Sequence, residues 1–135
     1  MASNRIRRDR DTRVVILDSS AIMMPFEFSI DLENELTRLL GKYHVVIPLP
    51  IVRELEFLSK NGAGNKKIKA KASLKFIEKF EAVDVCEENG DDSIVELAKK
   101  TKGTVVTNDT KLIARLKEIP VPIIFLRAKK KLAMK

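Results

Sequence analysis

Short, wholly apolar runs that alternate with amphipathic segments constrain the fold of this chain more than any other feature of its sequence. Val14–Leu17 is such a run, and its lack of polar alternation is typical of a β-strand covered on both faces. Asp18 ends it, and similar runs recur along the chain. We predict strands at residues 14–17, 45–47, 82–85, 104–106 and 121–126.

The segments between these runs have the periodicity of α-helices. Residues 31–40 carry leucines on one stripe, and Gly41 provides a stop. In residues 66–80 an apolar side chain recurs every four positions from Ile68 to Phe80, which predicts a buried stripe. The predicted helices are residues 31–40, 51–59, 66–80, 91–101 and 109–118, with a flexible loop at 61–65.

This alternation predicts an α/β fold: a single three-layer α/β/α domain with a mostly parallel central sheet, because parallel strands need crossover connections of this length. The 135 residues suffice for one such domain. In open parallel sheets the functional site lies outside the carboxyl ends of the strands. We therefore expect the chemistry of this protein at that edge.

Composition and missing motifs exclude several classes of protein. With 44% hydrophobic residues and one cysteine, Cys86, the chain is neither disordered nor a disulfide scaffold. No apolar run approaches the ~20 residues that cross a bilayer, and no signal core begins the chain, so we expect a cytoplasmic protein. The absence of a Gly-rich phosphate loop and of a nucleophile elbow argues against nucleotide hydrolysis, dinucleotide oxidoreduction and serine hydrolysis.

The net charge of +7 is concentrated at the two ends of the chain. Residues 1–13 sum to +3 and residues 127–135 to +5, which leaves −1 for residues 14–126. We therefore expect a basic N-terminal arm at 1–13, a globular domain at 14–126 and a basic C-terminal tail at 127–135. Basic ends favour a polyanion such as RNA as partner, although they also serve solubility alone.

Five carboxylates are expected at the carboxyl edge of the sheet. Asp18 follows the first strand directly, and Asp109 follows the fourth strand closely. Glu54 falls near the start of the helix after the second strand, and Asp91 and Asp92 open the helix before the fourth. Clustered carboxylates repel one another unless a cation neutralises them, so the pattern predicts a bound metal. Because these ligands are oxygen donors, Mg²⁺ or Mn²⁺ is favoured over zinc.

Each acid also has an ordinary explanation. Aspartate is preferred at helix N-caps, and the helix dipole favours acids in the first turn, so Asp18, Asp91, Asp92 and Asp109 fit helix caps as well. His44, the only histidine, starts a strand and is interpreted as structural.

An acidic cleft that holds divalent ions suits phosphodiester cleavage, since the metal lowers the pKa of a bound water and stabilises the leaving oxygen. Basic surfaces must then hold the polyanion. The candidate RNA-binding residues are Lys67, Lys71 and Lys75 on the helix at 66–80, with Lys79 on the same ridge, and Lys129, Lys130 and Lys131 in the tail. The alternative for the helical ridge is a solvated helix face.

Four short motifs occur in order along residues 14–126. They are Val15–Ser20, of the form strand-D-x-[NS]; Val46–Leu55, of the form I-P-x-x-V-x-x-E-L; Asp91–Ile94, of the form D-x-x-I; and Thr107–Asp109, of the form T-x-D. Together they resemble the PIN domain family, which includes VapC-type toxin ribonucleases and nucleases of ribosomal RNA maturation. The ending at residues 119–127, followed by lysines, resembles the short archaeal PIN proteins.

The resemblance implies roles for particular residues. The catalytic, metal-binding acids would be Asp18, Glu54, Asp92 and Asp109, and Asp91 stands where the family sometimes has a second acid, so that either Asp91 or Asp92 ligates directly. Ser20 and Thr107 would support the ligands or orient water.

The resemblance also implies a divalent-metal-dependent endoribonuclease that cuts single-stranded or looped RNA and leaves a 5′-phosphate and a 3′-hydroxyl. It further implies a homodimer and, as partner, an antitoxin or a ribosome-assembly factor. The alternative function is a non-catalytic PIN-like module that binds RNA during ribosome maturation, with the acids acting only as caps. A phospho-accepting receiver domain fits the order of the acids less well.

Overall fold

The structure is a computed structural model that describes residues 12–135. Of the predicted basic arm, Arg13 falls in this range and the other arginines lie outside the described residues. The strands are β1 (Arg13–Leu17), β2 (Tyr43–Pro48), β3 (Glu81–Val83), β4 (Thr104–Val106), β5 (Ile123–Arg127) and β6 (Lys131–Met134). The helices are α1 (Ser19–Phe28), α2 (Leu32–Leu40), α3 (Leu49–Asn61), α4 (Asn65–Phe76), α5 (Gly90–Thr101) and α6 (Thr110–Leu116), with a 3₁₀ turn, η2, at Ile77–Lys79.

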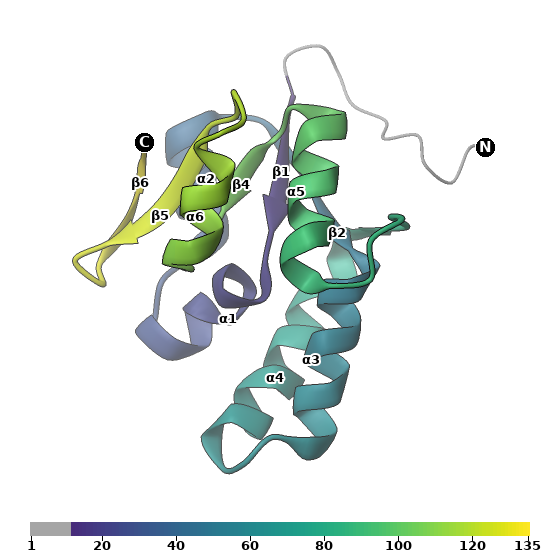
Figure 1. The fold of residues 1–135 in the computed structure, drawn as a ribbon. Coiled ribbons are helices and arrows are strands. Elements are labelled where there is room, and N and C mark those ends of the chain that lie inside the picture. The colour runs from purple at the N-terminus through teal and green to yellow at the C-terminus, as the bar shows by residue number, and fades with distance from the viewer. Residues whose placement is uncertain (1–11) are drawn as a thin grey trace.

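One sheet runs through the middle of the molecule in the order β3-β2-β1-β4-β5-β6. All neighbouring pairs are parallel except β5 and β6, which are antiparallel. In Figure 1, α5 and α6 cover the face of the sheet that is turned toward the viewer, and α2 lies behind it. The predicted three-layer α/β/α fold with a mostly parallel sheet is confirmed.

The central strand β1 is apolar because helices cover it on both faces. From Val14 to Leu17 no residue is more than 4% exposed. The carboxyl ends of β1, β2 and β4 point toward the end of the molecule where α1 and α3 begin (Figure 1). Polar residues that follow these strands therefore share one edge, which we term the carboxyl edge.

The sequence pattern does not predict α1. Ala21, Ile22, Met23 and Met24 are all buried, and Pro25 lies inside the helix. A helix shows an amphipathic period only when one of its faces is solvated. This helix is buried on most sides, so its composition resembles that of any apolar segment.

The basic C-terminal segment, which we predicted to be a tail outside the domain from residue 127 onward, instead belongs to the sheet. Arg127 ends β5, and Lys131–Met134 form β6. Leu132 is 1% exposed and joins the core, while its neighbour Lys131 is exposed. A single buried leucine among lysines is too weak a pattern to predict a strand.

The outer edge of β6 is closed by an ion pair on α2. Glu35 Oε1 accepts a hydrogen bond from Leu132 N at 2.9 Å, and Arg38 Nη2 donates to Leu132 O at 2.8 Å. The two side chains also pair with each other at 2.9 Å. Free backbone groups on an edge strand can template pairing with another chain. The ion pair therefore provides hydrogen-bond partners for the backbone N–H and C=O groups of Leu132 on this edge strand.

The α3–α4 pair projects from the body of the molecule (Figure 1). Ile68 on α4 is 66% exposed, and the buried residues of this helix are Ala70 and Ser73. The predicted buried stripe from Ile68 to Phe80 is therefore wrong at its start, because this end of α4 packs mainly on α3 and lies beyond the sheet. The helix also ends at Phe76 and continues as the turn η2.

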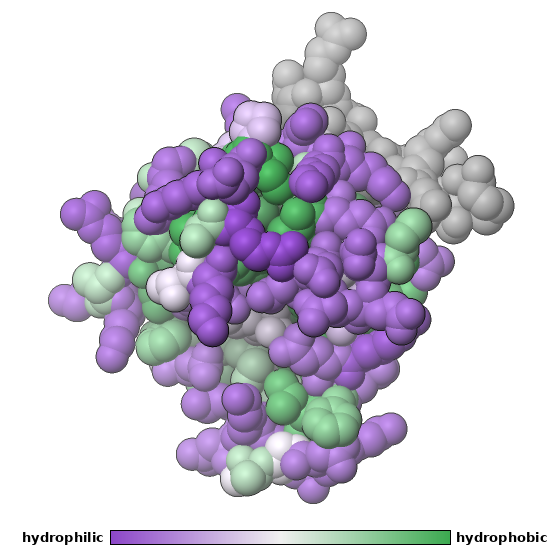
Figure 2. Space-filling model, in the orientation of Figure 1, coloured by the Kyte–Doolittle hydropathy of each residue, from purple (hydrophilic) through white to green (hydrophobic). Residues whose placement is uncertain are grey.

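The surface of the molecule is mainly polar. Figure 2 shows one face that is largely hydrophilic, with small, separate apolar areas. The exposed large apolar residues are Phe26, Phe57, Ile68 and Met134. Across residues 12–135, no helix has both the length and the apolar character required to cross a membrane.

Candidate active site

Asp18 is the most buried acid of the carboxyl edge. It follows β1 directly and is 4% exposed. Its Oδ1 accepts hydrogen bonds from Ala21 N at 2.9 Å and from Ser20 Oγ at 2.8 Å, so it caps α1. Its Oδ2 accepts a hydrogen bond from Thr107 Oγ1, which follows β4. Within the described residues no basic side chain pairs with it.

Burial makes the charge of Asp18 costly. Desolvation raises the pKa of its carboxyl from 3.8 to about 6, and the negative charge of Asp109 adds to this effect. Hydrogen bonds from Thr107, Ala21 and Ser20 act in the opposite direction without cancelling it. Asp18 is therefore a buried carboxylate whose charge the described residues compensate only in part.

Ser20 and Thr107 connect Asp18 to the loop between β4 and α6. While Thr107 Oγ1 donates to Asp18, it accepts a hydrogen bond from Asp109 N at 3.0 Å. While Ser20 Oγ donates to Asp18, it accepts one from Asn108 N at 3.0 Å. Each hydroxyl therefore donates one hydrogen bond to Asp18 and accepts one from a backbone N–H group of the loop. The structure thus brings both predicted supporting residues into contact with Asp18.

Asp109 lies at the start of α6. Its Oδ1 accepts hydrogen bonds from Lys111 N at 2.9 Å and Leu112 N at 3.2 Å, so it is the N-cap of this helix. No hydrogen bond from the described residues reaches its Oδ2. Its charge raises the pKa of both Asp18 and Asp91. The three carboxyls are therefore close enough to interact electrostatically.

The two acids that open α5 have different surroundings. The pKa of Asp91 is raised by burial and then by the charge of Asp109. Asp92 Oδ1 instead pairs with Arg115 Nη1 at 2.9 Å. The N-cap of α5 is Asn89 and not one of these acids. Its side-chain oxygen accepts hydrogen bonds from the backbone N–H groups of Asp91 and Asp92. Asp91 is therefore the acid of the pair whose pKa the charge of Asp109 raises, and Asp92 is the acid held in an ion pair.

Glu54 reaches the same edge from α3. Its Oε2 accepts a hydrogen bond from Ser19 Oγ at 3.1 Å. Its Oε1 lies against Gly90, where an added Cβ would stand 3.0 Å from it. Any side chain at position 90 would press on Glu54, so the glycine allows the first turn of α5 to approach α3. Glu54 therefore contacts both Ser19, which follows Asp18, and Gly90, which precedes Asp91.

These four acids border one edge without forming a compact metal-binding group. Within residues 12–135, no three or more Asp, Glu, His or Cys side chains are grouped so as to hold a metal ion. The donor chemistry nevertheless fits Mg²⁺ or Mn²⁺, because every donor is a carboxylate oxygen and Asp18 and Asp91 have raised pKa values. None of the four forms an ion pair in the described part of the chain. The four carboxylates are therefore suitable ligands for a hard divalent cation, although they are not already grouped around one point.

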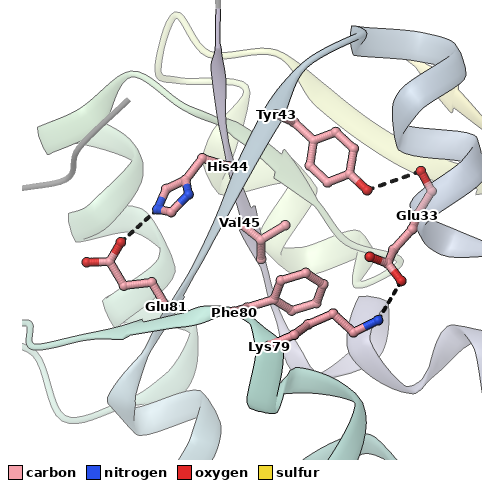
Figure 3. Close-up of a pocket in the computed structure, with 7 residues that line it drawn as sticks. All are labelled: Glu33, Tyr43, His44, Val45, Lys79, Phe80 and Glu81. Carbon is pink, nitrogen blue, oxygen red and sulfur yellow. Dashed lines mark hydrogen bonds and ion pairs between the residues drawn. The ribbon is translucent and has the colours of Figure 1, made fainter. Parts of the chain in front are cut away.

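His44 does not join the acids. It lines a cavity of about 360 Å³ at the amino end of β2, and its Nε2 lies 2.7 Å from Glu81 Oε1 (Figure 3). In the same cavity Lys79 Nζ binds Glu33 Oε1 at 2.8 Å. These contacts suit the structural interpretation of His44. They also mean that Lys79, unlike the rest of its predicted ridge, is held by an acid.

The predicted RNA-binding lysines lie on two surfaces. Lys67, Lys71 and Lys75 lie on α4, and Lys129, Lys130 and Lys131 lie in the β5–β6 turn and at the start of β6. All are exposed except Lys67, which is half-buried. None of the six forms an ion pair within the described residues, so their charges are available to phosphate groups.

Comparison with known proteins identifies the family. A family profile described as a PIN-like domain matches residues 15–129. The chain belongs to the PIN domain family. This PIN domain is 31% identical over 124 residues to Ribonuclease VapC9 of Archaeoglobus fulgidus, covering 92% of this chain and 90% of that protein. It is also 31% identical over 120 residues to Ribonuclease VapC4 of Methanocaldococcus jannaschii, covering 86% of this chain and 92% of that protein.

Solved structures agree with this assignment. The PIN domain endonuclease Utp24 superposes with a TM-score of 0.77 at 26% identity, over 93% of this chain and 92% of that one. VapBC2 from Rickettsia felis, bound to a DNA fragment from its promoter, gives a TM-score of 0.63 at 18% identity, over 84% of this chain and 99% of that one. The second likeness shows the fold alone.

Sequence reasoning missed three residues that organise this PIN domain. Ser19 holds Glu54, Asn89 caps α5, and Arg115 pairs with Asp92. Asn89 had a local signal, since asparagine directly before a helix is a preferred cap. The other two act across elements far apart in the chain, and their spacing in the sequence carries no signal.

Proposed function

We propose that this protein is a divalent-metal-dependent endoribonuclease that hydrolyses RNA phosphodiester bonds. The observation that carries the proposal is the buried Asp18, whose charge is only partly compensated and lies among three more acids in a chain that is 31% identical to two ribonucleases. A cation neutralises such a site and makes it competent to approach a phosphate. When bound there, Mg²⁺ or Mn²⁺ would lower the pKa of a water and stabilise charge on the leaving oxygen.

The acids that we propose as metal ligands are Asp18, Glu54, Asp91 and Asp109. The hydroxyls of Ser20 and Thr107 fix the carboxylate of Asp18, so its orientation does not depend on the metal. The helix cap leaves one oxygen of Asp109 without a hydrogen bond from the described residues. The family resemblance left the choice between Asp91 and Asp92 open, and we choose Asp91 because Asp92 is held by Arg115.

The chain's lysines would hold the RNA. Because the acids repel a polyanion, binding must come from the two lysine surfaces, on α4 and on the β5–β6 turn. The relatives named as VapC ribonucleases support a toxin-type role with an antitoxin partner. Processing of ribosomal RNA, a ribosome-assembly factor as partner, and a homodimer stay predictions from the family resemblance.

A second candidate is a PIN domain that binds RNA without cutting it. It is favoured by the observation that Asp18 and Asp109 cap helices and that no metal-binding group of three is formed within residues 12–135. Such a module needs no cation and would bind RNA equally well in EDTA.

The test is cleavage of a labelled, structured RNA in Mn²⁺ by the natural protein and three variants. We expect Asp18→Asn and Asp91→Asn to lose at least about 100-fold in rate, more than the ~10–100-fold typical of groups that only orient a metal ligand. The matched control is Asp92→Asn, which makes the same change one residue away and should stay within about three-fold of the natural rate. EDTA should abolish cleavage.

Other outcomes decide between the candidates. Equal losses in Asp91→Asn and Asp92→Asn would refute the assignment of Asp91. A natural protein that binds several RNAs, in chelator as well as in metal, and cuts none of them would establish the non-catalytic module.

A further inference from the structure

A second cavity lies next to the carboxyl edge, beside the β5–β6 hairpin. Its volume is about 380 Å³, within the range of pockets that hold small organic ligands. Two aromatic rings line it, Phe28 at the end of α1 and Phe125 on β5, together with the amide of Asn108. Two lysines, Lys129 and Lys135, also line this cavity and bring positive charge to it.

This cavity lies beside the residues that hold the acids. Asn108 and Thr110, which line it, flank Asp109 in the chain. Asn108 N donates to Ser20 Oγ, and Ser20 Oγ donates to Asp18. Two hydrogen bonds therefore separate the cavity wall from the most buried carboxylate. The cavity is therefore a neighbour of the acids on the surface of the protein.

The amide of Asn108 is oriented by the protein. Its Oδ1 accepts a hydrogen bond from Leu126 N at 2.9 Å, which fixes the oxygen toward β5. The two hydrogens on Nδ2 have no acceptor among residues 12–135. An amide with one end fixed and the other end free is suited to donate to the edge of a ligand.

One of the two lysines is held near a ring, and the other lies in a closed turn. Lys135 Nζ lies 5.2 Å from the centroid of the Phe125 ring. Lys129 is in the turn between β5 and β6, which Lys130 N closes on Arg127 O at 3.1 Å.

The turn itself is held in an uncommon conformation. Ala128 and Lys129 have φ values of 55° and 59°. Turns with two such residues strongly prefer Asn-Gly. The chain thus keeps a lysine at a position where local backbone energy favours glycine.

We propose that this cavity binds the base of the nucleotide next to the scissile phosphate of a single-stranded RNA, and so contributes to sequence preference. The rings offer an apolar surface for the base, Asn108 Nδ2 donates to its edge, and Lys129 and Lys135 contact the adjoining phosphate. The inference rests on the proposed function, because that function puts a phosphate at the acids. The observations that carry it are the mixed aromatic, amide and cationic wall and the hydrogen bonds that link Asn108 through Ser20 to Asp18.

The first test is an NMR titration of the natural protein with each of the four ribonucleoside 5′-monophosphates, in EDTA so that no cleavage occurs. We expect chemical-shift changes at the Asn108 side-chain amide, Phe125 and Lys129, with affinities that differ among the bases. Inorganic phosphate alone should move Lys129 and leave the Asn108 amide and the Phe125 ring in place. If phosphate reproduces every shift, the cavity is an anion site and the proposal is wrong.

Variants make the test quantitative. Lys129→Glu should weaken nucleotide binding at least about five-fold, and Phe125→Leu, which keeps an apolar strand residue, should remove the preference among bases. The matched control is Lys117→Glu, the same charge change at the exposed far end of α6, which should bind as the natural protein does. Equal weakening by Lys117→Glu would mean that only overall charge matters.

Failure of this inference and failure of the nuclease proposal look different. If the protein binds nucleotides in this cavity but cuts no RNA, the base pocket is supported and the nuclease proposal is refuted. If the protein cuts RNA but shows no chemical-shift changes at Asn108 and Phe125, the nuclease proposal is supported and the base pocket is refuted.

Discussion

Replacing Asp18 by asparagine should stabilise the protein at neutral pH while it removes activity. The carboxyl is 4% exposed, and burial raises its pKa from 3.8 to about 6. Between these two values the folded state holds a proton that the unfolded state has lost, so stability falls as pH rises. A shift of about two pKa units corresponds to a loss of about 3 kcal/mol, complete above pH 6. Asparagine carries no charge and escapes this loss.

The hydrogen bonds around the site can survive the substitution. Oδ1 of an asparagine would still accept from Ser20 and Ala21, and its amide would donate to Thr107, whose hydroxyl is free to rotate. The stability difference between Asp18→Asn and the natural protein should therefore grow by about 2–3 kcal/mol between pH 4 and pH 7.5. Any constant difference from imperfect hydrogen bonds does not depend on pH and leaves this growth unchanged.

The assay is urea unfolding followed by circular dichroism, at half-unit pH steps from 4 to 8, in EDTA. Glu56→Gln serves as the control for the loss of one negative charge, since Glu56 is exposed on α3. Adding Mn²⁺ at pH 7.5 should stabilise the natural protein more than Asp18→Asn, because a ligand that binds only the folded state stabilises it. A stability difference that stays flat or shrinks as pH rises would refute the reasoning about burial.

Three further substitutions test the packing and the edges of the sheet. Ser73 is fully buried, and its Oγ has no hydrogen-bond partner within residues 12–135, so Ser73→Ala should raise the free energy of unfolding by about 1 kcal/mol in urea. Glu35→Ala removes the acceptor for Leu132 N, and should lower stability by about 1 kcal/mol and raise the apparent mass in light scattering at high protein concentration. Ala128→Asn should gain about 0.5 kcal/mol in thermal unfolding, because asparagine tolerates a φ of 55°; a loss would mean that the alanine side chain itself contributes to the turn.

The interior of the fold was predictable where it depends on local pattern. β1 and β4 carry runs of apolar residues with no polar alternation, and these runs predict a parallel sheet covered on both faces. α2 and α5 have one solvated face, so their periodicity is visible in the sequence. α1 and β6 were missed for opposite reasons, since α1 is apolar on most sides and β6 has one buried leucine among lysines.

The candidate site was predictable in its location more than in its members. Asp18 and Asp109 follow parallel strands, and parallel strands end at one edge, so their proximity follows from order in the chain. The choice between Asp91 and Asp92 did not follow, because adjacent helical residues differ only in direction, and direction depends on how α5 packs. Arg115, which holds Asp92, lies on another helix.

The sequence by itself determined the alternation of strands and helices, the edge at which the acids meet, and the oxygen chemistry of their side chains. These properties depend on residue type and on neighbours within a few positions. Only the tertiary structure decided that Asp18 is buried with a raised pKa, that Asp92 pairs with Arg115, and that Phe28, Asn108, Phe125 and Lys129 share one cavity. Burial and side-chain direction are set by contacts between segments far apart in the chain, and no local pattern in a single sequence records those contacts.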